Sequence, residues 1–544
     1  MIKTLFNKLW NGETNGLTAA ALIVGGASLA SRIVGVFRDR VLASTFGAGE
    51  SLDAYYAAFR LPDLLYSLVI LGALSAGFIP VFAEYLETKS KDEAWRLAER
   101  VLSVVGATMM FICGALIVFA PILVPITVPG FQGDKLDITI QLTRIMALSP
   151  FFLGLSAVMG GILQATRRFF AFALAPVLYN VGIIFGALVL APVMGLEGVA
   201  WGVVLGAFLH FLTQASVALR LGLRRIPPPS FRTEGVRRII RLMAPRTAGL
   251  AVSQVNMVIL LSLASTLPVG SIAVFNLANN LQSFPVSIFG ISFAIAAFPN
   301  LSRAVARKDH EDFIHTISSA ARKIAFLIVP ATVLFILLRA QIVRLALGAG
   351  EFDWTDTIRT ADVLGLFVIS MLFQALVPLL ARAFYAIQDT WTPLLASLVA
   401  EAFNLVLALV LRESFGIMGL AVSFSVASAL NLLLLWWLLY YKKGSLGEGD
   451  FTRSLLRTFA ASLALLGFGW VARQGLGMVF PLRTFWQVAL QAAGTFIVGG
   501  MGFVIVAILL KSEEFHEFRI AAVRRFLKKG EVLAGAEEVH DIAS

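Results

Sequence analysis

The residues of this chain that could do chemistry are charged side chains inside its first two apolar segments. The stretch from Ser31 to Pro80 contains Arg32, Arg38, Asp39, Arg40, Asp53, Arg60 and Asp63. A charged side chain at the centre of a bilayer costs roughly 2.5–3.5 kcal/mol on insertion scales. We therefore expect these side chains to face inward, toward water, one another or an anionic ligand.

The spacing of these charges favours two helices that each have one charged face. Arg32 precedes Asp39 by seven residues, and Asp53 precedes Arg60 by the same number. Residues seven apart lie within about 20° of each other around a helix. We predict that the two faces form one wall of a polar cavity. Two further charges are expected at helix ends near the lipid headgroups, where long side chains reach water: Arg40 and Asp63.

The composition places the chain in a bilayer. Of its 544 residues, 58% are hydrophobic and 14% are charged, and the mean hydropathy is +0.84. Soluble domains carry about 25% charged residues. An apolar window of about 20 residues spans a membrane, and we find about fourteen such windows. The sequence therefore predicts an all-α integral membrane protein with about 14 transmembrane helices.

The placement of the basic residues predicts the orientation of these helices. The net charge of +11 alone would suit a nucleic-acid partner. However, Lys and Arg concentrate on alternate connections, while the connections 47–51, 267–271 and 348–356 contain neither. By the positive-inside rule both termini are cytoplasmic. We expect membrane lipids and no nucleic acid as partners.

An internal repeat relates two halves of the chain. LAST at Leu42–Thr45 returns at Leu263–Thr266, and GLEGVA at Gly195 is echoed by GIMGLA at Gly416. Both matches lie 221 residues apart. An offset that joins segments of equal orientation indicates parallel copies related by an axis along the membrane normal. We therefore predict two pseudo-symmetric six-helix lobes, followed by two extra C-terminal helices.

The predicted organisation has six parts. They are an interfacial N-terminal lead (1–16), an N-lobe with helices 1–6 (17–223), a Pro-rich cytoplasmic linker (224–235), a C-lobe with helices 7–12 (236–443), helices 13–14 (444–511), and a cytoplasmic amphipathic helix and tail (512–544). The lead and the segment after 512 show the apolar spacing of helices that lie on a membrane surface.

The C-lobe carries amides where the N-lobe carries charges. Its second segment offers Asn279, Asn280 and Gln282. A cavity between the halves would then be cationic on one wall and neutral-polar on the other. This suits a large ligand with phosphates at one end and sugars or peptide at the other, because Arg binds phosphate bidentately. Alternatively, the amides only bridge helices within the bundle.

Several motifs resemble the MurJ (MviN) lipid II flippase family of the multidrug/oligosaccharidyl-lipid/polysaccharide exporter superfamily. They are SRxxGxxRD at Ser31–Asp39, FGAG at Phe46–Gly49, DAYYAAFRLP at Asp53–Pro62, GALSAGFIPVFAEY at Gly72–Tyr85, LQATRR at Leu163–Arg168 and QDTWTP at Gln388–Pro393. The resemblance covers nearly the whole chain. It implies two six-helix lobes that form a V around a cationic cavity, and a groove for the undecaprenyl tail in helices 13–14.

The resemblance also implies a function and its site. The family moves lipid-linked peptidoglycan precursor from the inner to the outer leaflet of the bacterial cytoplasmic membrane by alternating access. We expect lipid II or a related undecaprenyl-pyrophosphate glycolipid as ligand, and cell-wall synthesis proteins as further candidate partners. The diphosphate would bind Arg32, Arg38 and Arg60. These arginines would be held in place by Asp39 and Asp53. The saccharide would meet Asn279, Asn280 and Gln282.

No cofactor or metal site is predicted. Of the positions that help to bind sodium in some family members, only Asn404 is kept, so the driving force (sodium or membrane potential) stays open. Cys113 is the single cysteine, which excludes an intramolecular disulfide and a thiolate metal cluster.

Other functions remain as alternatives. The chain could flip another lipid-linked oligosaccharide, or act as a drug/cation antiporter of the same superfamily, which would favour inward-facing acids over arginines. A scaffold for wall assembly without transport is a further alternative. An enzyme is not expected, because no carboxylate cluster of the kind that holds a metal and a phosphate stands on a loop.

Overall fold

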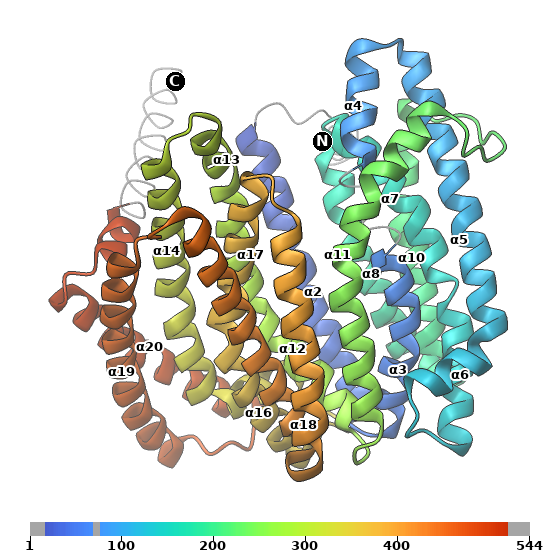
Figure 1. The fold of residues 1–544 in the computed structure, drawn as a ribbon. Helices are drawn as coiled ribbons and strands as arrows, with labels where there is room; N and C mark the ends of the chain where they lie inside the picture. Colours follow the sequence, from blue (N-terminus) through green and yellow to red (C-terminus); the bar gives the residue numbers. More distant parts are fainter. Residues whose placement is uncertain (1–16, 69–76, 521–544) are drawn as a thin grey trace, which may run out of the picture. The chain divides into compact units, whose positions relative to one another are not determined.

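The computed structural model describes residues 17–68 and 77–520, and these fold into helices without strands (Figure 1). The helices up to the linker are α2 (Leu17–Phe46), α3 (Glu50–Tyr66), α4 (Ile79–Thr88), α5 (Lys91–Thr127), α6 (Gly133–Met146), α7 (Ser149–Ala165), α8 (Phe169–Phe185), η3 (Gly186–Leu190), α9 (Ala191–Met194) and α10 (Leu196–Leu221). Those after it are α11 (Glu234–Ser265), α12 (Ser271–Pro285), η4 (Val286–Ile291), α13 (Ser292–Ala306), α14 (His310–Leu337), α15 (Arg339–Leu347), α16 (Trp354–Phe367), η5 (Val368–Ser370), α17 (Met371–Ala386), α18 (Trp391–Lys443), α19 (Glu448–Val479) and α20 (Phe485–Leu509).

The helices have the length and composition of membrane spans. In the described part of the chain, ten helical stretches are long and apolar enough to cross a bilayer. One of them, α18, is 53 residues long and contains a break at Gly416, so it covers two predicted windows. The all-α membrane fold is confirmed, while the number of fourteen spans stays a prediction. The predicted lead (1–16) and the end of the predicted tail (521–544) lie outside the described residues.

The chain divides into two compact units. The first takes its residues from Met1–Leu281, Ala346–Val363 and Ser397–Phe424, and the second from Gln282–Leu345, Leu364–Ala396 and Ser425–Ser544. In the first, α10 packs against α7 and α8, α2 against α8, and α3 against α6. In the second, α19 and α20 pack against each other and α19 against α14. The six-part organisation read from the sequence stays a prediction.

The internal repeat recurs in the local backbone geometry. Gly195 and Gly416 have nearly the same conformation, with φ/ψ of 61°/−142° and 55°/−132°. Only glycine adopts these angles without strain. Arg167 and Gln388 form a second pair at the same offset, with φ of 56° and 61°. The matched sequences therefore build matched turns, which supports a duplicated unit.

Close packing of α8 and η3 on α10 depends on glycine. Gly182 and Gly186 face Gly202 and Gly206. A Cβ built on Gly182 would lie 2.3 Å from the Gly206 Cα, and one built on Gly206 would lie 2.3 Å from the Tyr179 carbonyl oxygen. Small residues let membrane helices approach until their backbones touch. These helices position Asn180, which takes part in the site described below.

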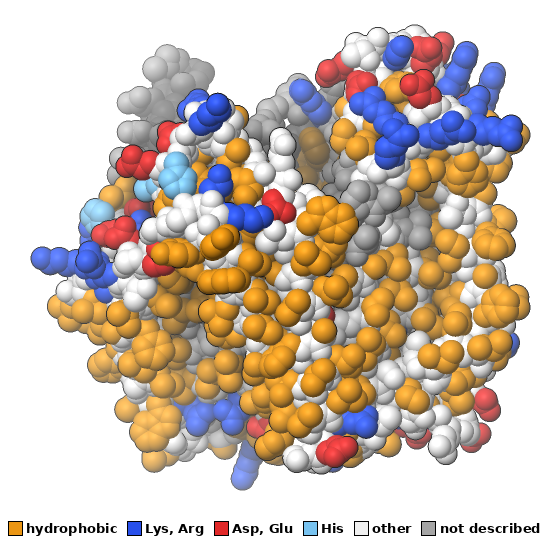
Figure 2. Space-filling model, in the orientation of Figure 1, with side chains coloured by type: hydrophobic (Ala, Val, Ile, Leu, Met, Phe, Trp, Pro, Cys, Tyr) orange, Lys and Arg blue, Asp and Glu red, His pale blue; other side chains and the backbone are white. Residues whose placement is uncertain are grey.

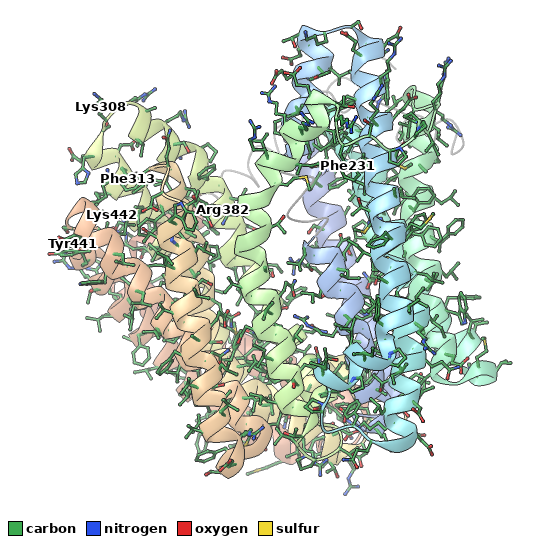
Figure 3. The ribbon with its side chains drawn as sticks, turned by 45° about the vertical axis from the view of Figure 1, so that its right-hand side comes forward. Phe231, Lys308, Phe313, Arg382, Tyr441 and Lys442 are labelled. Carbon is green, nitrogen blue, oxygen red and sulfur yellow. The ribbon has the colours of Figure 1, made fainter. Side chains whose placement is uncertain are left out.

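Cationic side chains gather at the helix ends. Figure 2 shows them over the ends of α4 and α5, with apolar side chains covering the helix sides below. In the second unit, Figure 3 places Lys308, Phe313 and Lys442 at one end. There Lys442 pairs with Asp389, which also accepts the Thr392 N–H at 3.0 Å. Partial burial acts against ionisation of this carboxyl, but the bonds from Lys442 and Thr392 outweigh it and lower the pKa of Asp389 to about 2.

We predict that Gly206→Ala destabilises the protein by about 1–3 kcal/mol, because the added methyl group overpacks the α8–α10 contact. Gly500→Ala is the matched control, since a Cβ there would meet no atom within 4 Å. Thermal unfolding of the purified variants in detergent gives the comparison. Equal midpoints for both variants would contradict the packing argument.

A second prediction concerns pH. Because the pKa of Asp389 is lowered from its ordinary value of 3.8 to about 2, its ion pair stabilises the fold above about pH 4. That contribution is lost as the pH falls toward 2. We expect Asp389→Asn to lower the free energy of unfolding at pH 7 by less than about 1 kcal/mol, since the pair is partly exposed, and to lower the thermal midpoint accordingly. The gap between variant and wild type should shrink as the pH is lowered to 3, and a constant gap would contradict the assignment.

Candidate functional site

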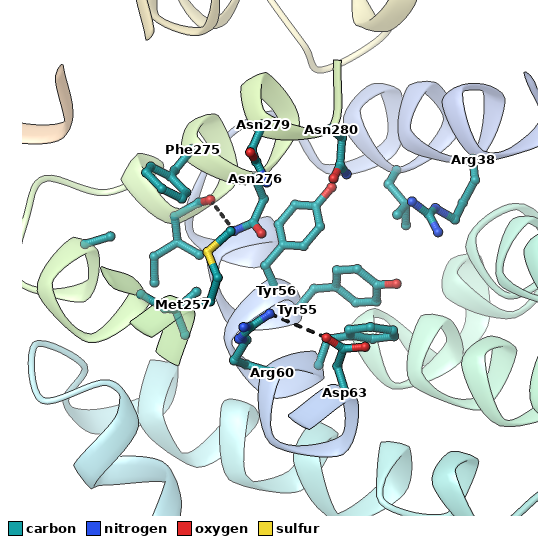
Figure 4. Close-up of a pocket in the computed structure, with 15 residues that line it drawn as sticks. Arg38, Tyr55, Tyr56, Arg60, Asp63, Met257, Phe275, Asn276, Asn279 and Asn280 are labelled. Atoms are coloured by element: carbon teal, nitrogen blue, oxygen red, sulfur yellow. Dashed lines mark hydrogen bonds and ion pairs between the residues drawn. The ribbon is translucent and has the colours of Figure 1, made fainter. Parts of the chain in front are cut away.

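A polar cavity lies in the first unit, among α2, α3, α11 and α12 (Figure 4). Its volume is about 220 Å³. We call it the main cavity. Its polar lining comes from two arginines, one acid, two tyrosines and three asparagines: Arg38, Arg60, Asp63, Tyr55, Tyr56, Asn276, Asn279 and Asn280. The predicted inward orientation of charges from the first two segments is therefore seen for Arg38 and Arg60.

Arg38 belongs to a hydrogen-bond network of side chains from three helices, α2, α8 and α12. Its Nε and Nη2 donate to Asp39 Oδ1 at 3.0 and 2.7 Å, and its Nη1 donates to Asn180 Oδ1 at 3.0 Å. The other oxygen of Asp39 accepts the Asn280 amide at 3.0 Å. Asp39 is buried, with 5% of its surface exposed. Asp39 thus holds Arg38 as predicted, and these contacts use three of the five N–H groups of the guanidinium.

Arg60 is held more loosely. Its Nη2 donates to the Gln254 side chain at 2.9 Å, and its Nη1 lies 3.4 Å from Asp63 Oδ2 (Figure 4). Within the described residues, the buried Arg60 Nε and the Tyr56 hydroxyl have no hydrogen-bond partner. Buried donors in folded proteins are normally satisfied. The main cavity therefore contains donor groups suited to an acceptor-rich ligand.

The charges of the main cavity nearly cancel. Arg38 is paired with Asp39, and Arg60 with Asp63. The expected cationic wall is therefore neutralised by internal carboxylates in this conformation. Asp63 was expected at a helix end near the headgroups; it lies in the last turn of α3, which contains Pro62, and it lines the main cavity. A membrane helix tolerates proline at this position because neighbouring groups can bond the backbone carbonyl that loses its N–H partner.

Asp53 has a different role from the predicted one. Its carboxylate accepts the backbone N–H groups of Gly270 and Ala273 at 2.8 and 2.9 Å, and no arginine of the described ranges 17–68 and 77–520 pairs with it. Lys135 pairs with it at 3.1 Å. Asp53 thus caps the start of α12 and joins it to α3 and α6. A carboxylate at a helix N-terminus is favoured by both the free N–H groups and the helix dipole.

Further contacts join the same end of the first unit. The Glu351 N–H donates to the Ser44 carbonyl at 2.9 Å, and the Ala48 N–H donates to Asp356 at 2.9 Å. Arg40 lies near the same loop, 3.5 Å from the Gly348 carbonyl oxygen. The connections that meet here are those free of Lys and Arg in the sequence. The expected position of Arg40 at a helix end near the headgroups stays a prediction.

Two other predicted site residues lie outside the lining of the main cavity. Arg32 is half-buried on α2 and does not line it. Gln282 is 1% exposed and accepts the Gln374 amide at 3.1 Å. Asn279 and Asn280 share a helix face with Asn276, whereas Gln282 comes two residues after Asn280 and is turned by about 200° from it.

Sequence reasoning missed several groups around the arginines. The tyrosines of the DAYYAAFRLP motif line the cavity, and Asn180 on α8 holds Arg38. The run Tyr55–Tyr56, which begins two residues after the charged Asp53, was a usable signal, because two phenols close to a charge are unusual in an apolar segment. Asn180 gave no signal, since nothing local distinguishes one amide within an apolar helix.

Sodium cannot be assigned a site from the described residues. Asn404 is fully buried, and its side chain interacts with that of Glu401. Glu401 lies one turn earlier and offers a second oxygen group. Hard cations take about six oxygen ligands, and the described residues contain no cluster of three or more His, Cys, Asp or Glu suited to a metal. We therefore derive no step through an ion.

Comparisons with known proteins identify the family. The model of the lipid II flippase MurJ family matches residues 42–485. A relative from Vibrio cholerae serotype O1, described as a probable lipid II flippase MurJ, is 31% identical over 464 residues, which cover 83% of this chain and 87% of the relative.

Solved structures show the same fold. A lipid II flippase MurJ in an inward closed conformation matches with a TM-score of 0.75 at 22% identity, covering 90% of this chain and 99% of that one. An inward-facing multidrug resistance MATE family transporter of the MOP superfamily matches with a TM-score of 0.67 at 18% identity, covering 79% and 99%. The fold alone thus fits flippases and drug transporters, but the sequence match spans most of the chain and is specific. On this evidence, the chain belongs to the lipid II flippase MurJ family.

Proposed function

We propose that this chain is a flippase that moves lipid II from the cytoplasmic to the outer leaflet of the bacterial cytoplasmic membrane by alternating access. The observation that carries the proposal is the main cavity, in which two guanidinium groups lie among membrane-spanning helices with donor groups left for a ligand. Membership of the family supports a lipid-linked substrate. The charge bias of the connections supports cytoplasmic termini.

The diphosphate binds by taking the place of Asp63 beside Arg60, while Arg38 stays paired with Asp39 and offers its remaining N–H groups. An unpaired guanidinium in a medium of low dielectric constant costs several kcal/mol, so Asp39 and Asp63 keep both arginines paired before the substrate arrives. Phosphate oxygens then accept the N–H groups of Arg38 and Arg60, which can bind them bidentately. Because one anion replaces another, no arginine is left buried without a counter-ion. The Tyr56 hydroxyl and the amides of Asn279 and Asn280 meet the uncharged parts of the head group.

Alternating access requires the contacts around Asp53 to break. They join α3 and α6 to the start of α12, and the neighbouring contacts join Ser44 and Ala48 to residues 351–356. By the charge bias this end faces the outside. We infer that these bonds close the outer end while substrate enters from the cytoplasm.

Replacing the cavity arginines tests the diphosphate role. We expect Arg38→Ala and Arg60→Ala each to weaken binding of lipid II at least about tenfold, because a charge-assisted bond contributes about 1.5–3 kcal/mol. Neither variant should rescue cells depleted of their own flippase. Native mass spectrometry of the purified variants measures binding apart from expression.

Arg96→Ala is the matched control, because Arg96 is exposed on α5. It removes the same charge from the chain and should bind lipid II and rescue growth like the wild type. Wild-type affinity of both cavity variants for lipid II would refute the assigned roles.

The closing role of Asp53 can be tested with a single thiol. Cys113 is the one cysteine of the chain, so Cys113→Ala gives a background without thiols. In it, Ala48→Cys places a thiol where the native side chain is 3% exposed. We expect Asp53→Asn to raise the rate at which a membrane-impermeant maleimide labels this thiol about tenfold, because charged hydrogen bonds that hold the end closed are lost.

Asp137→Asn, an exposed acid on α6, serves as the control and should leave the labelling rate unchanged. Equal labelling rates in the Asp53→Asn and Asp137→Asn backgrounds would show that Asp53 does not keep this end closed.

A drug or cation transporter is the second candidate function. Asp63 favours it, because an acid in an aromatic cavity attracts organic cations. The two arginines of the same cavity oppose it. Competition between a cationic dye and lipid II discriminates: tight dye binding that lipid II does not displace would favour the cation transporter.

A further inference from the structure

A second cavity opens inside the helices of the first unit, beside the main one. It is bounded by α2, α3, α7, α8 and α10, and its volume is about 270 Å³. We call it the side chamber. Arg38, Phe59 and Asp63 line both cavities, so the two meet along α3. A volume of this size holds one amino-acid side chain, and the proposed diphosphate site leaves it unused.

Asp63 gives the side chamber its charge. It is the one acid among the described residues that line either cavity. Its ion pair with Arg60 is long, at 3.4 Å, and 31% of its side chain is exposed to the cavities. Arg60 lines the main cavity only. Asp63 is therefore a weakly paired carboxylate on the boundary between the two spaces.

Aromatic rings line the side chamber together with this carboxylate. Phe59, Tyr66 and Tyr179 line the side chamber, and the Asp63 charge interacts with both phenol groups. Rings with a carboxylate among them are the chemistry that recognises ammonium groups, through the ring faces and the opposite charge.

The other polar groups of the chamber do not oppose a cation. Arg38 is neutralised by its two bonds to Asp39 Oδ1. His210 is held through Nδ1 by the Ser156 hydroxyl at 2.7 Å. Ser149, at the start of α7, donates to the Met146 carbonyl at the end of α6 at 2.8 Å. The charge that the side chamber presents to a ligand is thus set by Asp63.

We propose that the side chamber binds a primary ammonium group of the translocated head group, with Asp63 as its counter-ion. This rests on the proposed function and deepens it: the substrate would be a lipid whose head group carries both a diphosphate and a peptide with a free side-chain amine. When the diphosphate takes Arg60, Asp63 loses its partner, and the ammonium replaces it. Both buried charges then remain paired, and neither half of the substrate binds as well without the other.

The test compares two forms of lipid II, one with the side-chain amine free and one with it acetylated. We expect the wild type to bind the free amine about tenfold more tightly, as a desolvated ammonium among aromatic rings and a carboxylate would give. Asp63→Asn should bind both forms alike, with an affinity near that of the wild type for the acetylated form. Asp63→Glu keeps the carboxylate and should keep the preference, as should the exposed control Asp137→Asn.

The outcomes separate this inference from the proposed function. Equal binding of both forms by the wild type, or an undiminished preference in Asp63→Asn, overturns the ammonium site. If the wild type binds neither form, the proposed function fails instead.

Binding of the acetylated lipid is also measured with and without Na⁺. A gain with Na⁺ that Asp63→Asn abolishes would assign the chamber to an inorganic cation and overturn the proposal.

Discussion

The structure depends on the pairing of a guanidinium group inside the membrane. Arg38 is held between Asp39 on its own helix and Asn180 on α8, and Asn280 on α12 completes the network through Asp39. A charge in the bilayer interior is tolerated only when it is paired and hydrogen-bonded. The glycines that bring α8 against α10 fix where Asn180 lies. The packing of α8 on α10 therefore also positions a hydrogen-bond partner of Arg38 in the cavity.

The same pairing explains how a nearly neutral cavity can receive a highly charged head group. Each arginine forms an ion pair with a carboxylate. The pair of Arg60 with Asp63, at 3.4 Å, is longer than that of Arg38 with Asp39, at 2.7 Å. Binding then exchanges counter-ions rather than burying new charges, which avoids most of the desolvation cost. Loose pairing at Arg60 favours exchange there, whereas the buried Asp39 keeps Arg38 in place as a fixed anchor.

Local patterns predicted the fold class and part of the site. Hydropathy gave the membrane helices, and the 221-residue offset located glycines with matching positive φ at Gly195 and Gly416. Helical spacing predicted that Arg60 faces inward, and the cost of a charge in the bilayer predicted the same for Arg38. The partners of Asp53 could not be predicted, because the N–H groups of Gly270 and Ala273 lie more than 200 residues away in the chain. Asp63 was expected near the lipid headgroups because of the cost of a buried charge, whereas it lines the main cavity paired with Arg60 of the same helix.

The most direct test of the central claim is the distance between phosphorus and guanidinium nitrogen in the complex. Solid-state NMR dephasing between ³¹P of bound lipid II and ¹⁵N-labelled arginine measures it, with Arg38→Lys and Arg60→Lys samples to assign the signals. We predict contacts at both arginines that correspond to N–H···O distances of about 2.7–2.9 Å. Bound lipid without dephasing at either arginine would contradict the exchange of carboxylate for diphosphate.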